Sequence, residues 1–191
     1  AAAFLTECGV KIIGVSDVST GIYNAKGLVL SAVAEHVART GFLKGYPDAQ
    51  EISNEAMLEL ECDILVPAAL QNQITEANAG RIKCKLLAEG ANGPTTLEAD
   101  EILSRRGIFV LPDILGNAGG VTVSYFEWVQ NTQELAWTLE ETNDRLHKIM
   151  TGAFRRTLLR SQRDDIDMRT AALIEGIERV AQAKLLRGVF P

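Results

Sequence analysis

Apolar residues in the first 120 positions gather in short runs that alternate with amphipathic stretches. Four runs have the length and the apolar or β-branched content of buried parallel strands, at residues 10–16, 62–66, 85–89 and 108–111. Helical spacing predicts helices at residues 28–39, 75–82 and 95–106, a short helix capped by Ser53 or Asn54, and a glycine- and asparagine-rich turn at residues 20–27. Because only βαβ crossovers fit such short connections, we expect an α/β fold, a Rossmann-like, doubly wound and mostly parallel sheet.

From Gly119 onward the pattern is that of helices alone. Residues 121–133, 139–160 and 170–186 have the period of long amphipathic helices, with a break at 164–167. The sequence therefore predicts a dinucleotide-binding domain over residues 1–120 and a C-terminal all-helical segment over residues 121–191.

Two helix boundaries carry specific signals. Thr95, followed by Glu98 three residues later, has the pattern of a capping box and is expected to begin its helix. At the other end of the chain, AAAFLTECG is typical of the last turns of a helix closed by Gly9, with no initiator Met before it. We therefore expect the sequence to be a fragment that lacks a preceding first strand.

Composition narrows the possible partners. The chain of 191 residues has 19 Lys and Arg against 25 Asp and Glu, a net charge of −6, which argues against a nucleic-acid partner. The longest apolar run, residues 64–70, is far below the roughly 20 residues of a membrane span. Three cysteines without a CxxC pair predict reduced thiols in a cytoplasmic protein, and no spacing predicts a metal site.

Small and polar residues follow every predicted strand. In an open parallel sheet, ligands bind outside the carboxyl ends of the strands, so these positions are the candidate site. Asp17 stands where a Rossmann fold places the acid that binds the adenosine ribose, although a turn-forming role is the alternative. Asn92 and Asn117 lie in neighbouring glycine loops, where they could match a carboxamide or form Asx turns. The two histidines, His36 and His147, lie in predicted helices and are expected to be packing or surface residues.

Long motifs in the chain resemble one family. EGANGPTT at 89–96 and PDILGNAGGVTVSYFEW at 112–128 are similar to the carboxy-terminal cofactor domain of hexameric glutamate dehydrogenases, as are VSDVSTGIYN at 15–24, CDILVPAAL at 62–70, ADEILSRRGI at 99–108 and DMRTAA at 167–172. The wider superfamily includes leucine, phenylalanine and valine dehydrogenases. The TVSYFEW segment resembles the glutamate branch.

The resemblance implies NAD(P)-dependent oxidative deamination of L-glutamate to 2-oxoglutarate and ammonia. Its implied roles are adenosine-ribose binding by Asp17 and Val18, lining of the cofactor by Ala68 and Ala69, nicotinamide binding by Asn92 and Asn117, and contact with the substrate side chain by Val121 and Ser124. NAD is favoured over NADP because a carboxylate at Asp17 repels a 2′-phosphate. A homo-hexamer is also implied.

The resemblance also implies what this chain does not contain. The catalytic lysine and aspartate belong to an amino-terminal substrate domain, and the glycine-rich phosphate loop (GxGxxG) does not occur in the 191 residues. We therefore expect no catalytic residue here and no activity from the isolated chain. Two other functions stay open: a dehydrogenase for an apolar amino acid (leucine, phenylalanine or valine), and a non-catalytic paralogue or regulatory subunit.

Overall fold

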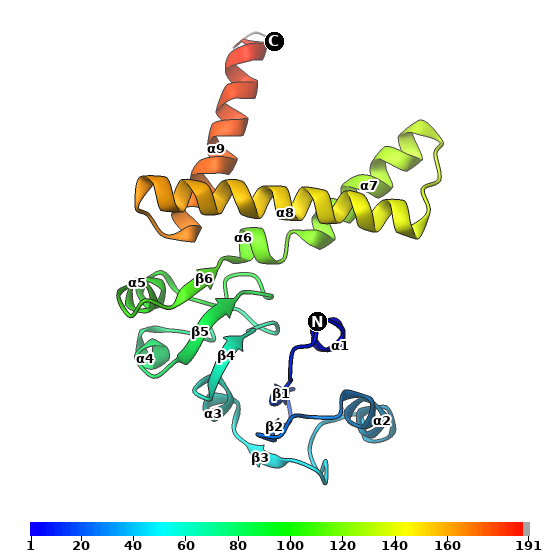
Figure 1. The fold of residues 1–191 in the computed structure, drawn as a ribbon, viewed down its shortest axis with the longest axis vertical. Helices are drawn as coiled ribbons and strands as arrows, with labels where there is room; N and C mark the ends of the chain where they lie inside the picture. Colours follow the sequence, from blue (N-terminus) through cyan, green and yellow to red (C-terminus); the bar gives the residue numbers. More distant parts are fainter. Residues whose placement is uncertain (189–191) are drawn as a thin grey trace. The chain divides into compact units, whose positions relative to one another are not determined.

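The computed structural model describes residues 1–188, which contacts divide into two compact units (Figure 1). The first unit comprises Ala1–Glu61 with Arg81–Lys83, and the second comprises Cys62–Gly80 and the chain from Cys84 onward. The four segments that the sequence predicts as parallel strands of one doubly wound sheet do not lie in one sheet. Each unit has its own three-stranded sheet.

The first unit is built on an antiparallel sheet. Strands β1 (Gly14–Ser16), β2 (Gly21–Tyr23) and β3 (Gln50–Ile52) pair in that order, with Ile22 opposite both Val15 and Glu51. Three helices accompany them, α1 (Ala2–Glu7), α2 (Leu30–Thr40) and α3 (Asn54–Leu58). The core is formed by Ile22, Val33, Leu43 and Tyr46.

The prediction of a parallel strand at residues 10–16 is wrong in its length and its pairing. Only Gly14–Ser16 forms a strand, and its partner comes from the segment predicted as a turn. The cause is a tight reversal in which the Asp17 amide donates to the Thr20 carbonyl at 3.0 Å. Such a short reversal returns the chain beside itself, which produces an antiparallel hairpin.

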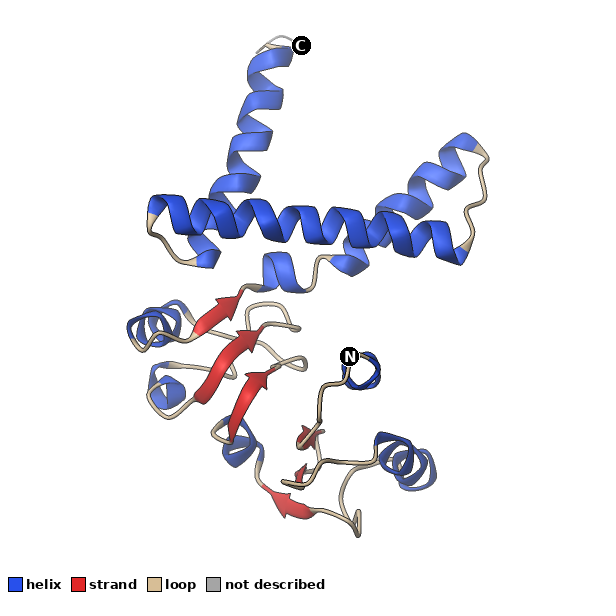
Figure 2. Cartoon of the chain, viewed as in Figure 1, coloured by secondary structure: helices blue, strands red, loops and turns tan. Residues whose placement is uncertain are grey.

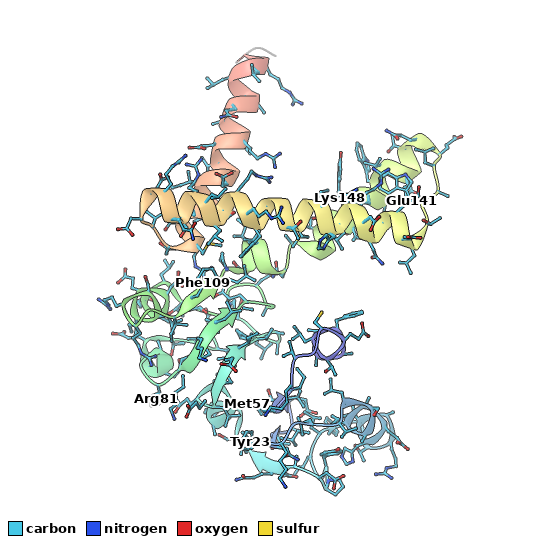
Figure 3. All side chains as sticks on the ribbon, viewed as in Figure 1. Tyr23, Met57, Arg81, Phe109, Glu141 and Lys148 are labelled. Carbon is cyan, nitrogen blue, oxygen red and sulfur yellow. The ribbon has the colours of Figure 1, made fainter. Side chains whose placement is uncertain are left out.

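Met57 joins α3 to this hairpin. A Cβ built on Gly14 would lie 2.8 Å from Met57 Sδ, and one on Gly21 would lie 2.8 Å from Met57 Cε. The two glycines therefore leave the space that the flexible thioether fills (Figure 3). Ser53 caps α3 by accepting from the Ala56 amide, one of the two caps that the sequence predicts.

The second unit contains the small parallel sheet. Its strands are β4 (Glu61–Leu65), β5 (Lys83–Ala88) and β6 (Phe109–Leu111), in that order, and Figure 2 shows all three arrows pointing the same way. Helices α4 (Glu76–Ala79) and α5 (Leu97–Arg105) connect the strands and pack against each other. Ile74, Leu87 and Leu103 are fully buried, and β5 pairs with β6 in parallel, so this part of the βαβ prediction is confirmed.

The predicted start of α5 is one residue too early. Thr96, not Thr95, is the N-cap, and its hydroxyl accepts from the Ala99 amide at 3.3 Å. Thr95 instead forms a parallel bridge with Ile74 and is buried. The extended backbone that the bridge requires therefore delays the helix by one residue.

The helices that follow the sheet in the described part of the second unit are a short one that the sequence did not predict and then the three long ones that it did. These are α6 (Asp113–Gly116), α7 (Gly119–Gln133), α8 (Leu139–Asp164) and α9 (Met168–Arg187). Thr138 and Glu141 form a capping box at the start of α8, and the Asp167 side chain caps α9. Arg160 ties α8 to α9 through Glu175 and Glu178. Among the helices of residues 1–188, none is long and apolar enough to span a membrane.

Candidate functional site

The end of the parallel sheet borders a hollow of about 880 Å³. It is lined by residues that follow β4, β5 and β6, namely Ala69, Leu70, Gln71, Gly90, Ala91, Asn92, Ile114, Asn117, Ala118 and Val121. Six of these ten residues are glycine, alanine or asparagine. Small side chains leave room for a ligand to approach the backbone, at the edge where open α/β sheets bind their ligands.

Backbone hydrogen bonds tie the loops after β4 and β5 together. The Pro67 carbonyl accepts from the amides of Gly90 and Ala91 at 3.1 and 3.0 Å. A Cβ on Gly90 would come within 3.0 Å of Ala68 Cβ. This close approach explains why small residues occupy both loops, and it places Ala68 beside the hollow that Ala69 lines.

The two candidate amides lie side by side at this hollow. Asn117 Nδ2 donates to Asn92 Oδ1 at 2.7 Å and approaches the Gly90 carbonyl at 3.5 Å. In the part of the chain that the structure describes, Asn117 Oδ1 and Asn92 Nδ2 have no recorded partner. The pair therefore offers one acceptor and one donor, which is the complement of a primary carboxamide.

Behind the amide pair, a buried carboxylate joins the loops after β5 and β6. Glu89 is 1% exposed, and its Oε2 accepts from the Asp113 amide at 2.8 Å. Asp113 Oδ2 in turn accepts from the Gly93 amide at 2.8 Å. Each loop thus holds the other through a carboxylate, which fixes the positions of Asn92 and Asn117.

Arg169 at the start of α9 completes this group. It donates to Glu89, Asp100 and Asp113 at 2.7, 2.7 and 3.3 Å. Burial alone would lower the pKa of the Arg169 guanidinium, but hydrogen bonds to Asp100 and Glu89 raise that pKa above its ordinary value. The roles of Glu89 and Arg169 were not predicted from the sequence: both residues lie in family motifs, but no local pattern links positions 80 residues apart.

The carboxylate of Asp17, in the first unit, accepts hydrogen bonds from its own turn and from a more distant backbone amide. Its Oδ1 accepts from the amide and hydroxyl of Ser19 and from the Thr20 amide, and its Oδ2 accepts from the Leu43 amide at 2.8 Å. Burial opposes the charged form, but these bonds to Ser19 and Leu43 lower the pKa of Asp17 below its ordinary value. Oδ2 retains capacity for a further donor, while the neighbouring Val18 is 88% exposed.

The two candidate substrate residues differ in their placement. Val121, in the first turn of α7, lines the hollow and is 70% exposed. Ser124 is one turn further along α7, is exposed, and donates to the Gly120 carbonyl at 3.1 Å. It does not line the hollow. Its oxygen nevertheless keeps its acceptor capacity, and its proton can rotate to another partner.

Two of the sequence expectations concern residues outside the site. His36 is buried, bonds the Lys44 carbonyl through Nε2 and packs edge-on against Tyr46, whereas His147 is exposed on α8. The packing and surface roles expected for the two histidines are confirmed. Within residues 1–188, no group of three or more His, Cys, Asp or Glu side chains is placed to hold a metal ion.

Because Gly116 has no side chain, α6 can pack closely against the backbone of Glu89. A Cβ at Gly116 would lie 2.9 Å from the Glu89 carbonyl oxygen, a backbone atom that cannot rotate away. We expect Gly116→Ala to lower the free energy of unfolding by about 1–3 kcal/mol, measured by chemical denaturation. Gly176→Ala on α9 is the matched control, because a Cβ there meets nothing within 4 Å and alanine favours helix. Equal stability of Gly116→Ala and the parent would contradict this close packing.

Comparisons with known proteins give consistent results. A family model described as Glutamate/Leucine/Phenylalanine/Valine dehydrogenase matches residues 1–188. A glutamate dehydrogenase of Thermotoga maritima is 52% identical over 185 residues, which are 97% of this chain and 44% of that protein. A NAD-specific glutamate dehydrogenase of Staphylococcus aureus is 48% identical over 187 residues, 98% of this chain and 45% of that protein.

The fold comparison agrees. The leucine-bound hetero-hexameric glutamate dehydrogenase of Thermus thermophilus superposes with a TM-score of 0.91 at 29% identity, covering 100% of this chain and 45% of that one. Glutamate dehydrogenase of Peptoniphilus asaccharolyticus gives 0.80 at 30% identity, covering 98% of this chain and 44% of that one. This chain thus spans less than half the length of these relatives. It belongs to the glutamate/leucine/phenylalanine/valine dehydrogenase family.

Proposed function

We propose that this chain is the cofactor-binding part of a NAD-dependent glutamate dehydrogenase, which converts L-glutamate to 2-oxoglutarate and ammonia. The observation that carries the proposal is 46–52% identity, over nearly the whole chain, to proteins named glutamate dehydrogenase. Relatives from Bacillus subtilis and Staphylococcus aureus are named as NAD-specific, which favours NAD.

The residues at the end of the parallel sheet fit a nicotinamide nucleotide. The free donor and acceptor of the Asn92–Asn117 pair match the carboxamide group, and the small residues beside them, including Ala68 and Ala69, leave space for the flat ring. When bound, NAD supplies the hydride acceptor. Protein groups would hold its nicotinamide end in a fixed orientation.

Asp17 and Val18 are proposed to bind the adenosine ribose. The remaining acceptor capacity of Asp17 Oδ2 suits a ribose hydroxyl, and the lowered pKa keeps the carboxyl charged at neutral pH. A charged carboxylate disfavours the 2′-phosphate of NADP, so the same residue supports NAD over NADP.

We assign substrate contact to the first turns of α7. Val121 lines the hollow, and Ser124 follows three residues later, so both belong to neighbouring positions of one helix face. A carboxylate is favoured near a helix N-terminus because the free amides and the helix dipole attract negative charge. Ser124 is thus proposed to donate to the side-chain carboxylate of glutamate.

The catalytic residues of the reaction are proposed to lie outside this chain. Because the chain covers about 44% of its relatives, we propose that the catalytic lysine and aspartate belong to a substrate domain and that residues 1–191 alone are inactive. Residues 1–120 would form the cofactor domain, and residues 121–191 would return toward the substrate domain. A cytoplasmic homo-hexamer is proposed from the same resemblance.

One assay tests this function against its alternatives. The intact mass of the natural protein is measured first, and the whole protein is then incubated with NAD or NADP and with glutamate, leucine, phenylalanine or valine, while formation of the reduced cofactor is followed by absorbance. We expect turnover of glutamate with NAD. Turnover of an apolar amino acid but not glutamate would identify a related dehydrogenase. No turnover of any substrate would favour a regulatory subunit.

A further inference from the structure

A single guanidinium contacts three carboxylates from different elements of the second unit. Arg169 lies in the first turn of α9, while Glu89 follows β5, Asp100 belongs to α5 and Asp113 begins α6. The Arg169 side chain is 16% exposed, and that of Glu89 is 0% exposed. Charge-assisted bonds shielded from water in this way are strong and well oriented. The start of α9 is therefore fixed to the end of the sheet, next to α6 and β6 (Figure 1).

The partners of Arg169 lead directly to the loops that carry the amide pair. Glu89 uses its other oxygen to accept from the Asp113 amide, and Asp113 uses its other oxygen to accept from the Gly93 amide. Gly93 is the residue after Asn92, and Asp113 lies one turn before Asn117. Arg169 thus orients the two carboxylates that set the separation of the loops, although it does not line the hollow itself.

We propose that Arg169 is a positioning residue for the Asn92–Asn117 pair, and that it thereby sets the affinity of this site for the nicotinamide end of the cofactor. The identity of the ligand rests on the proposed function. The positioning itself rests only on the contacts of Arg169, Glu89 and Asp113.

The charge and the shape of the guanidinium both matter. Arg169→Met retains most of the apolar stem but leaves the Glu89 carboxylate buried beside the loops without its cation. Arg169→Lys retains the charge, but an ammonium cannot reproduce the planar fork that reaches Glu89 and Asp100 together. The two variants therefore separate loss of neutralisation from loss of geometry.

The first experiment measures how well the two loops are held in place when no cofactor is present. Hydrogen exchange of the Gly93 and Asp113 amides is followed in the whole protein, in the parent, Arg169→Met and Arg169→Lys. We expect exchange about tenfold faster or more in Arg169→Met, with an intermediate value in Arg169→Lys. Arg163→Met is the control, because Arg163 is exposed and its recorded bonds go to Asp164 on α8. Unchanged exchange of both amides in the Arg169 variants would overturn the positioning role.

The second experiment measures the binding of the cofactor. We expect Arg169→Met to raise the Kd and the KM for NAD about tenfold, while the KM for glutamate stays within about twofold of the parent. In Glu89→Gln/Arg169→Met the buried charge and its partner are removed together, and most of the NAD affinity should return. A lowered melting temperature with parental NAD binding would show that Arg169 only anchors α9, and would overturn the proposal.

Two further outcomes are decided by the same set of proteins. If Arg169→Met does not fold, Arg169→Lys carries the test, and parental NAD binding and amide exchange in that variant would overturn the proposal. If the parent protein binds no NAD, the proposed function and the cofactor part of this proposal both fail. The exchange rates of Gly93 and Asp113 then still decide whether Arg169 positions the loops.

Discussion

Glu89→Ala is expected to lower the free energy of unfolding by about 3–5 kcal/mol, the usual effect of removing one partner from a buried ion pair. The substitution removes the acceptor of the Asp113 amide and the most buried of the three partners of Arg169. It also leaves a cavity behind the loops, because the Glu89 side chain is fully buried. Chemical denaturation followed by circular dichroism measures the change.

Two companion variants make this result specific. Glu89→Gln keeps the size of the side chain and an oxygen that accepts from the Asp113 amide, so its effect should be clearly smaller than that of alanine. Glu101→Ala, on the exposed side of α5, should change stability by no more than about 0.5 kcal/mol. A Glu89→Ala protein as stable as Glu101→Ala would show that the buried carboxylate does not hold the loops.

Ser124→Ala is expected to raise the KM for glutamate about ten- to a hundredfold in the whole enzyme, with little change in the KM for NAD. The proposed bond from the Ser124 hydroxyl to a substrate carboxylate is charge-assisted, and losing such a bond weakens binding by about 1.5–3 kcal/mol. In the structure the hydroxyl donates to the Gly120 carbonyl, so binding of substrate requires only rotation of the hydroxyl proton. Steady-state kinetics with each substrate varied in turn provides the measurement.

Thr132→Ala is the matched control for Ser124→Ala. Thr132 lies on the same helix, is exposed, and its hydroxyl donates to the carbonyl four residues earlier at 2.8 Å, as that of Ser124 does at 3.1 Å. Loss of this local bond alone should leave the kinetics unchanged. Glutamate kinetics that are equal in the two variants and the parent would remove Ser124 from the substrate site.

The spacing of apolar residues along the chain was sufficient to predict most of the second unit. Three of the four expected parallel strands form β4, β5 and β6, and the long helices start and end close to their predicted positions. Strands of parallel sheets are typically short continuous apolar runs, and long helices carry an apolar stripe with helical spacing, so each leaves a recognisable pattern in the sequence. A helix cap adds a second local signal, as Ser53 shows.

The first strand could not be predicted in the same way, because its pairing depends on a turn. The run at residues 10–16 is apolar enough for a parallel strand, but hydrogen bonds from Ser19 and Thr20 to the Asp17 carboxylate close a hairpin immediately after it. An acid followed by Ser and Thr fits an Asx turn as well as the strand-end acid of a Rossmann fold. Sequence alone left both roles open for Asp17.

The sequence predicted the two amides at the end of the parallel sheet but not the residues that support them. Asn92 and Asn117 could be found because each follows a strand in a glycine loop, and the structure places them in contact. Glu89 and Arg169 were missed as a pair because nothing local to DMRTAA indicates that its arginine reaches a carboxylate in a distant segment. Contacts of this kind are visible only in three dimensions.

The long reach of Arg169 has a consequence for how the protein is made. Its ion pairs with Glu89, Asp100 and Asp113 span 80, 69 and 56 residues of chain. Contacts between such distant positions form late, because a large loop must close before they stabilise anything. During synthesis the strands β4, β5 and β6 leave the ribosome well before α9. Until α9 follows, Glu89 has no Arg169 to pair with. The loops that carry Asn92 and Asn117 therefore reach their final arrangement only after α9 has been translated, and ribosome-bound chains that stop before Arg169 cannot form these ion pairs.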